Sequence, residues 1–441
     1  MGASALTLNR ENAVERNPMK NRILLFSLLF VCSIVSAGEL VKVKPSKAGF
    51  DGDRLDRIDK MIQGCVDRRE VPGAVAILIK DGKIGYHKAF GWADIDSRKP
   101  VEKRSLFRIA SMSKLITTVA ALQLFEKGHF DLNTSLGDML PEFENQVVFK
   151  SWDESNQAFV AEPAKRQIRM RHLFTHTSGI VYPIFTDQGR AGYLRAKITD
   201  AFPNGQITLE ENIKRLASVP LAHEPGEKFT YGMNMDVLGR VIEVLDGRPF
   251  AKYMREEIFD VLDMDDTGFS VKKKKQDRVV TVYTTVDDDL AVYDDEVIAE
   301  LAPNNYREWW KQDSDAIAMG GGGIISSAYD YARFLQMLLN GGELGGERIL
   351  GRKTVELLSR GLYQSDPEAS TAMGLSVSVV TDASKHYHPE SEGAYNWGGY
   401  FYTSFWVDPK EGFIGVLMSQ VNPTKSRMGG QFKIMAYSAL E

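Results

Sequence analysis

The sequence predicts an α/β protein: an antiparallel sheet built from both chain ends and flanked by helices, with a mainly helical inserted subdomain. Three observations predict it: a β-hairpin pattern near residue 80, a second near residue 410, and helical spacing of apolar residues between them. The 441 residues are 43% hydrophobic and 26% charged, a composition typical of soluble globular proteins. We expect residues 38–441 to form a single domain, with the helical insertion at about 130–310.

The first 37 residues have the pattern of an export signal. Met19-Lys20-Asn21-Arg22 is basic, ILLFSLLFVCSIV is apolar, and Val35-Ser36-Ala37 offers small residues for cleavage. The apolar run is shorter than the roughly 20 residues that a membrane-spanning helix needs. We therefore expect translation to start at Met19, cleavage after Ala37, and a periplasmic or secreted product without an integral membrane span. An uncleaved anchor is the alternative.

The two hairpin patterns lie at opposite ends of the remaining chain. In AVAILIKDGKIGYHKAFG, Asp81-Gly82 is a turn signal between two apolar runs. In YTSFWVDPKEGFIGVLMSQ, the turn falls at 408–412. Because a hairpin makes its two strands antiparallel, we expect a sheet that combines strands from both ends.

Between the hairpins the signals are mostly helical. We expect helices over 111–127, 209–218, 234–246, 250–262 and 327–340. In the first of these, Leu115, Val119, Leu122 and Phe125 are spaced so that they share one helical face. The border between the sheet and the helical subdomain is then the default place for a ligand cleft.

Charge and metal-ligand content argue against several classes of function. The net charge is −5 and the pI about 5.9, so neither nucleic acid nor an anionic membrane is expected as a partner. The run Lys272–Lys275 fits a solvated loop. No cluster of His, Cys, Asp and Glu has metal-ligand spacing, and we expect neither a metal nor a cofactor.

The first chemical motif is FRIASMSK, in which Ser111 precedes Lys114 by one helical turn at the start of a predicted helix. The positive end of the helix dipole disfavours the ammonium form of a lysine at this place. A partly neutral amine beside a hydroxyl can activate that hydroxyl as a nucleophile. Because S-x-x-K is short enough to occur by chance, the motif alone leaves both interpretations open.

The second candidate is Tyr231, in PGEKFTYGMNMDVLGRVIEVLDG. Helical spacing starts at Val237, so we expect Tyr231 in the loop just before a helix, where it can point into a cleft. A tyrosine between two cations can serve as a general base. A packing role is the alternative.

The third candidate is the stretch YNWGGYFYTSFWVDP. Gly398 and Gly399, which we expect to open a strand, permit close approach of a ligand to the backbone. The N–H of Tyr400 can then pair with the N–H of Ser111 to bind a developing oxyanion. A β-bulge is the competing explanation of the two glycines.

These motifs, in this order, resemble the serine β-lactamase and penicillin-binding-protein superfamily, most of all the class C β-lactamase-like hydrolases and the family VIII esterases. The stretches VPGAVAILIKDGKIGYHKAFGWAD, IRMRHLFTHTSGI and MGGGGIISSAYDYARFLQMLLNGG extend the resemblance over about 50–420. It implies that Ser111 is the acyl-accepting nucleophile, Lys114 its proton partner and Tyr231 the second-motif tyrosine. It also implies an oxyanion hole formed by the amides of Ser111 and Tyr400.

Two departures from the family pattern concern the substrate. The second motif usually reads Tyr-x-Asn, whereas here Asn234 stands one place late. The third motif usually opens with Lys or His, whereas here it is Trp397-Gly398-Gly399, which is typical of the esterase-like branch. The missing cation would pair with the carboxylate of a penicillin or a D-Ala-D-Ala peptide. We expect Trp397, Gly398, Gly399 and Asn234 to contact the substrate.

The sequence thus predicts an exported serine hydrolase that cleaves carboxylic esters through an acyl-enzyme on Ser111. Its substrate is expected to be a small-molecule ester or a β-lactam-like compound. The first alternative is a β-lactamase or D-Ala-D-Ala carboxypeptidase that uses the same machinery. The second is a non-catalytic cell-wall binding or sensor module.

Overall fold

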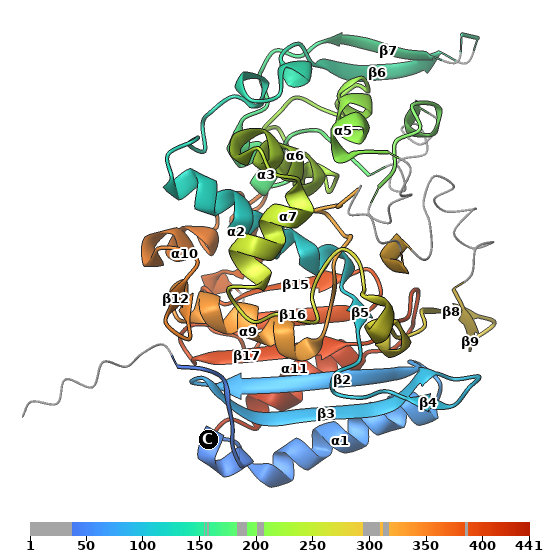
Figure 1. Cartoon of the computed structure of the whole chain (residues 1–441), viewed down its shortest axis with the longest axis vertical. Coiled ribbons are helices and arrows are strands. Elements are labelled where there is room, and N and C mark those ends of the chain that lie inside the picture. Colours follow the sequence, from blue (N-terminus) through green and yellow to red (C-terminus); the bar gives the residue numbers. More distant parts are fainter. Residues whose placement is uncertain are drawn as a thin grey trace, which may run out of the picture. The chain divides into compact units, whose positions relative to one another are not determined.

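The computed structural model describes residues 38–153, 155–156, 158–182, 192–200, 207–293, 309–311, 317–383 and 387–441. The predicted export signal, residues 1–37, lies outside the described residues. Among the described residues, nine strands form one large sheet in the order β1-β3-β2-β17-β16-β15-β14-β13, with β4 paired to β3 (Figure 1). They are β1 (Val41–Lys42), β2 (Gly73–Lys80), β3 (Lys83–Asp94), β4 (Lys99–Pro100), β13 (Thr371–Met373), β14 (Ser378–Val380), β15 (Tyr395–Gly399), β16 (Thr403–Asp408) and β17 (Phe413–Met418).

Both predicted hairpins are present, as β2–β3 and β16–β17. Asp81 and Gly82 both have positive φ, 49° and 74°, as a tight hairpin turn requires. The two hairpins meet where β2 pairs antiparallel with β17, so the sheet does combine both chain ends. The predicted fold class is confirmed, with one difference: β1 joins the edge of the sheet parallel to β3.

Helices cover both faces of this sheet (Figure 1). On one face, α1 (Gly52–Asp67) and α11 (Met428–Ser438) pack against side chains such as Leu78 and Leu417. On the other, α9 (Ala328–Leu339) and α2 (Ser113–Glu126) share a core with Ile77 and Val416. Because successive residues of a strand point to opposite faces, Ile77 and Leu78 enter different cores.

The helical part between the two hairpins follows the predicted order. Its elements are α3 (Met170–Phe174), α5 (Leu209–Ala217), α6 (Asn234–Asp246), α7 (Phe250–Met254) with a π-helical turn (Arg255–Phe259), and, nearer the sheet, α10 (Arg352–Leu358). The segment also holds paired strands that the sequence did not predict: β6 (Val147–Asp153) with β7 (Ala158–Pro163), and β8 (Tyr283–Val286) with β9 (Asp289–Val292). Two shorter pairs are β5 (Phe107–Arg108) with β10 (Ile325–Ser326) and β11 (Glu343–Leu344) with β12 (Glu347–Arg348).

The helix α2 differs from its prediction. We expected an amphipathic helix with one apolar face, but every residue from Ser113 to Leu122 is buried. The reason is its position, because α2 packs on α6 of the helical subdomain and also belongs to the core above the sheet. A helix that is enclosed on all sides is apolar all round, and its polar members then need partners inside the protein.

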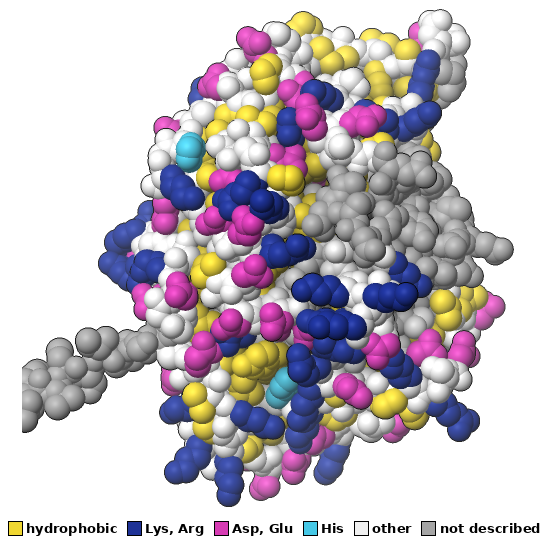
Figure 2. All heavy atoms as spheres, in the orientation of Figure 1, with side chains coloured by type: hydrophobic (Ala, Val, Ile, Leu, Met, Phe, Trp, Pro, Cys, Tyr) yellow, Lys and Arg dark blue, Asp and Glu magenta, His cyan; other side chains and the backbone are white. Residues whose placement is uncertain are grey.

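The surface carries charged side chains of both signs on the face drawn in Figure 2. In Figure 2, cationic and anionic side chains lie interspersed over the visible face, with apolar side chains scattered between them. In the part of the chain that the structure describes, no helix has the length and apolar character needed to cross a bilayer.

Candidate active site

Ser111 lies in a short 3₁₀ turn, Ala110–Met112, that leads directly into α2. The residue before it, Ala110, is buried and has φ of 44°, in the left-handed region that residues with a Cβ seldom adopt. A hydrogen bond stabilises the turn: the hydroxyl of Tyr331 on α9 donates to the carbonyl of Met112 at 3.0 Å. Strained backbone of this kind persists only where its surroundings fix it, and it is common at active sites.

Lys114 is buried at the first turn of α2, with 1% of its surface exposed. Its Nζ lies 3.1 Å from Ser111 Oγ, 3.1 Å from the hydroxyl of Tyr182 and 2.5 Å from the carbonyl oxygen of Gly321. A neutral amine has two N–H donors and one lone pair. It can therefore donate to Gly321 and Tyr182 and accept the proton of Ser111, which is the arrangement that activates a serine hydroxyl.

Tyr231 stands in the loop immediately before α6, where we expected it. Its ring centroid is 4.7 Å from Lys114 Nζ, 5.5 Å from the ring of Tyr182 and 5.8 Å from the ring of Trp397. Ser111, Lys114, Tyr231 and Trp397, which are far apart in the sequence, thus lie in one site. Tyr182 adds a second tyrosine, and it is Tyr182 whose hydroxyl bonds to Lys114.

The stretch RHLFTHTSGI supports the loop that carries Tyr231. His176 is fully buried; its carbonyl accepts the N–H of Thr230, and its Nδ1 lies 2.9 Å from Nδ2 of Asn234. Burial lowers the pKa of His176 well below its ordinary value, so its ring is neutral and can accept at Nδ1. Gly232 also fits only without a side chain, because a Cβ would collide with the carbonyl of Ile180.

The expected substrate contact of Asn234 is corrected by this arrangement. Asn234 is fully buried, its Oδ1 accepts the hydroxyl of Ser178 at 2.5 Å, and its Nδ2 faces His176. Both ends of the amide are therefore used inside the protein, and the residue fastens the 176–178 turn to α6. The one-residue displacement from the usual Tyr-x-Asn spacing moves this side chain into the core.

A buried carboxylate stands behind Lys114. Asp236 on α6 is fully buried, and its Oδ1 accepts the N–H of Gly321 at 2.8 Å, while the carbonyl of Gly321 faces Lys114. Burial raises the pKa of Asp236 to about 6, and the hydrogen bond from Gly321 acts in the opposite direction. Burial and the Asp236 charge together raise the pKa of Tyr182 well above its ordinary value, so its hydroxyl keeps its proton.

The end of β15 approaches the Ser111 turn from the sheet. The Trp397-Gly398-Gly399 stretch closes this strand and does not open one, which corrects our expectation. A glycine is needed at 399 because the backbone there packs closely against other parts of the protein. A Cβ would collide with the carbonyl of Ile109 and the hydroxyl of Thr403. Tyr400 follows at once and belongs to the same apolar cluster as Ala110. The oxyanion hole formed by the amides of Ser111 and Tyr400 stays a prediction.

The edge of β15 nearest Ser111 is open to a ligand. Strand β14 pairs with β15 only at Asn396 and Tyr395, whereas β16 pairs with it as far as Gly399. The backbone from Trp397 to Gly399 therefore has no strand beside it on the β14 side within the described part of the chain. Gly398 is exposed and Trp397 and Gly399 are half-buried, and contact of these three residues with a substrate stays a prediction.

Three residues of the site were missed in the sequence: Tyr182, Gly321 and Asp236. For Asp236 a signal existed, because a carboxylate stands there between Met235 and Val237, in the stretch of α6 that is buried. For Tyr182 and Gly321 there was none, since they are 68 and 207 residues from Lys114 along the chain.

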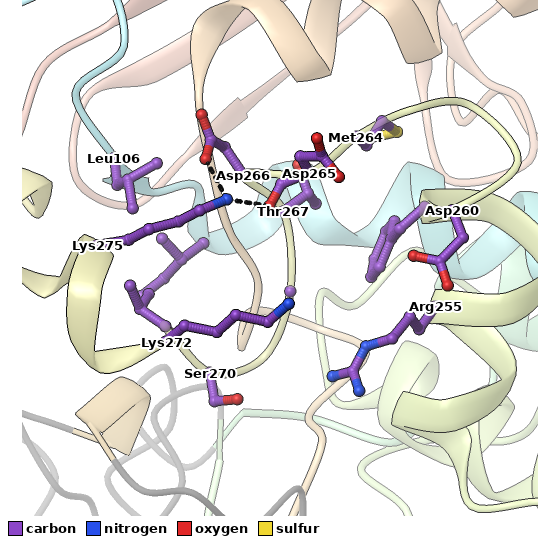
Figure 3. A pocket seen from close by; sticks show the side chains of 14 residues that line it. Leu106, Arg255, Asp260, Met264, Asp265, Asp266, Thr267, Ser270, Lys272 and Lys275 are labelled. Atoms are coloured by element: carbon purple, nitrogen blue, oxygen red, sulfur yellow. Dashed lines mark hydrogen bonds and ion pairs between the residues drawn. The ribbon is translucent and has the colours of Figure 1, made fainter.

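A separate hollow of about 260 Å³ does not belong to this site (Figure 3). It is bordered by Arg255, Lys272 and Lys275. Its lining does not include Ser111, Lys114, Tyr231 or Trp397. Lys275 bonds to Asp266, as the dashed line shows, at 2.8 Å. The residues 272–274 are exposed, as expected of a solvated segment. Among the described residues, no group of His, Cys, Asp and Glu is placed to hold a metal ion.

Comparison with known proteins gives a consistent answer. The family model described as Beta-lactamase matches residues 58–437. The chain is 28% identical to Esterase EstB of Burkholderia gladioli over 393 residues, which covers 87% of this chain and 94% of that protein. It is 27% identical to the Lovastatin esterase of Penicillium rubens over 381 residues, 81% of this chain and 91% of the other.

Solved structures agree. "EstCE1, a hydrolase with promiscuous acyltransferase activity" superposes with a TM-score of 0.74 at 25% identity, over 88% of this chain and 98% of that one. Simvastatin Synthase (LovD) from Aspergillus terreus superposes with a TM-score of 0.72 at 22% identity, over 88% and 99%, and supports the fold.

Proposed function

Because the chain belongs to the Beta-lactamase family and is a serine hydrolase, we propose that it cleaves carboxylic esters through an acyl-enzyme on Ser111. The observation that carries this proposal is the contact between Lys114 Nζ and Ser111 Oγ, 3.1 Å, in a buried site that offers Trp397 where a cation would hold a β-lactam carboxylate. Two relatives that cover most of the chain are named as esterases.

In the proposed reaction, Ser111 Oγ attacks the ester carbonyl carbon and passes its proton to Lys114. The two N–H groups of the Lys114 amine donate to the hydroxyl of Tyr182 and the carbonyl of Gly321. The lone pair of the amine is then left to accept the proton of Ser111. The carbonyl oxygen becomes an oxyanion that the amides of Ser111 and Tyr400 stabilise.

The intermediate then collapses. The bond to the alcohol oxygen breaks, and the alcohol leaves with a proton supplied through Lys114 and Tyr231. Water attacks the acyl carbonyl carbon and gives a proton to Lys114 and Tyr231. The bond between this carbon and Ser111 Oγ then breaks, Oγ takes up that proton, and the carboxylic acid leaves. The step requires no metal or cofactor.

The test uses a fluorophosphonate probe and p-nitrophenyl butyrate. We expect one adduct, on the peptide that contains Ser111, and complete loss of both labelling and hydrolysis in Ser111→Ala. Ser438→Ala, at the exposed end of α11, is the control for the same substitution away from the site. Hydrolysis retained by Ser111→Ala, or an adduct on another residue, would overturn the covalent mechanism.

Export is part of the proposal and rests on the sequence of residues 1–37. Basic residues, an apolar run too short to span a bilayer and small residues before Gly38 support cleavage after Ala37. N-terminal sequencing of the protein recovered from a bacterial host tests it. A new N-terminus at Gly38 in the periplasmic or secreted fraction is expected, and an intact N-terminus in the membrane fraction would indicate a retained anchor.

Acyl transfer to an alcohol is a second candidate activity. EstCE1, whose structure is similar to this one, is described as a hydrolase with promiscuous acyltransferase activity, and an acyl-enzyme can be attacked by an alcohol in place of water. If acyl transfer occurs, adding methanol yields methyl butyrate besides butyric acid. Release of butyric acid alone would exclude it.

A further inference from the structure

A second hollow, of about 240 Å³, adjoins the aromatic side chains beside Lys114. Its apolar walls are Phe229, Tyr363, Met373 and Trp397, and its polar groups include Thr371 and Ser378. None of the described residues that line it carries a charge. Phe229 is 39% exposed, so the apolar wall that it forms is accessible to a ligand.

The hollow lies next to the proposed active site and shares Trp397 with it. The ring of Trp397, which lines it, is 5.8 Å from the ring of Tyr231, and Tyr231 in turn lies 4.7 Å from Lys114 Nζ. The ring of Phe229 stacks on Tyr231 at 6.5 Å. Two layers of aromatic side chains thus connect the hollow to Lys114: first Trp397 or Phe229, which line it, and then Tyr231.

The walls are held in place by the fold. Ser378 on β14 pairs with Asn396 on β15 and with Met373 on β13, so the hollow extends over three neighbouring strands. At about 4.8 Å between strands, this is roughly 10 Å from β15 to β13. The hydroxyl of Tyr363 accepts the N–H of Phe229 at 3.2 Å and joins the two walls.

We propose that this hollow binds the apolar part of the substrate and that the natural substrate is a neutral ester bearing a group larger than a benzene ring. The inference rests on the proposed esterase function. A cavity of about 150 Å³ is enough to hold benzene, and this one is 240 Å³. A charged group would lose its hydration without gaining a partner there. The hydroxyls of Thr371 and Ser378 permit a neutral polar substituent.

The first experiment compares esters that differ only in size. For the acyl side, p-nitrophenyl acetate is compared with p-nitrophenyl 2-naphthylacetate; for the alcohol side, methyl acetate is compared with 2-naphthylmethyl acetate. We expect kcat/KM at least tenfold higher for the larger member of one series, and that series identifies which part of the ester enters the hollow. Equal values in both series would overturn the proposal.

The second experiment fills the hollow. Thr371 is exposed on the edge strand β13, so Thr371→Trp adds an indole at little risk to the fold, and Ser378→Phe fills the same space from β14. Both variants are expected to lose the preference for the naphthyl ester at least tenfold, measured as the ratio of kcat/KM for the naphthyl ester to kcat/KM for the small ester. Val160→Trp, at a 46% exposed position of β7, adds the same indole elsewhere as a control. If both filled variants keep the preference, the hollow is not the subsite.

A binding measurement separates this inference from the esterase proposal. 2-Naphthylacetamide, which is neutral and has no ester to cleave, is titrated calorimetrically into the unmutated protein and into Thr371→Trp. Binding that is lost in the variant supports the subsite even if no ester is hydrolysed, which would refute only the esterase proposal. No binding to the unmutated protein, together with normal hydrolysis of p-nitrophenyl acetate, would refute only the subsite.

Discussion

Replacing Asp236 by Asn is expected to change how the stability of the fold depends on pH. Asp236 is fully buried in α6; its Oδ1 accepts the N–H of Gly321, and its Oδ2 has no hydrogen-bond partner in the described part of the chain. Burial raises the pKa of this carboxyl from 3.8 to about 6. The unfolded chain, in which the group is hydrated, has the ordinary value.

The magnitude follows from this difference in pKa. From about pH 4 to pH 6, the folded protein binds a proton on Asp236 that the unfolded chain releases. The stabilisation is complete below about pH 4 and is lost as the pH rises through about 6. At 1.36 kcal/mol per pKa unit, the ionised group lowers the free energy of unfolding at pH 7 by about 3 kcal/mol relative to pH 4. An asparagine does not titrate and removes this dependence.

The assay is urea denaturation of the unmutated protein and Asp236→Asn at several pH values between 4.5 and 7.5. The buried amide of the variant leaves N–H donors without partners, at a cost of about 1–3 kcal/mol that is the same at every pH. The difference between the two unfolding free energies should therefore move by about 2 kcal/mol in favour of the variant between pH 4.5 and pH 7.5, since part of the full 3 kcal/mol falls below this range. Asp53→Asn, exposed on α1, controls for the loss of one negative charge. A difference that stays constant with pH would refute the reasoning.

Three further predictions concern catalysis, substrate and acid stability. Tyr231→Phe should lower kcat about 100-fold or more with little change in KM, since a general acid–base group acts in the transition state. Tyr182→Phe should also lower kcat. If either variant keeps its kcat for p-nitrophenyl butyrate, the substituted tyrosine has a packing role. The unmutated enzyme should hydrolyse p-nitrophenyl butyrate readily and nitrocefin slowly. Trp397→Lys should shift the ratio of the two kcat/KM values towards nitrocefin by roughly ten- to hundred-fold, which is the equivalent of one charge-assisted hydrogen bond. A tenfold preference of the unmutated enzyme for nitrocefin would indicate a β-lactamase. Burial lowers the pKa of His172 to about 4, so as the pH falls the unfolded chain binds a proton on this side chain before the folded protein does. The free energy of unfolding should therefore fall by about 3 kcal/mol from pH 6.5 to pH 4. His172→Asn should flatten this part of the plot of urea midpoint against pH, and an unaltered plot would contradict the prediction.

The sequence by itself determined those features that depend on neighbouring residues. Alternating and apolar runs around Asp81-Gly82 predicted β2 and β3, because a two-residue turn with positive φ fixes a hairpin locally. Helical spacing predicted α6 and placed Tyr231 just before it. The three-residue spacing of Ser111 and Lys114 put both side chains on one side of a turn, and their atoms are 3.1 Å apart.

Tertiary structure decided which side chains complete the site. Lys114 meets Tyr182 and Gly321 only because α2 is enclosed between the sheet and the helical subdomain, and the same enclosure buries the helix on all sides instead of one. Asn234, one position from the usual spacing, turns into the core and bonds to Ser178.

The electrostatics of the site also belong to the packed structure. The pKa of Asp236 rises because packing removes water from a carboxyl whose Oδ2 finds no donor among the described residues. The same Asp in an exposed loop would be hydrated, and this desolvation would not raise its pKa. Periodicity and turn chemistry act over a few residues and can be deduced from the sequence, whereas burial and contacts across 68 or 207 residues exist only once the chain has packed.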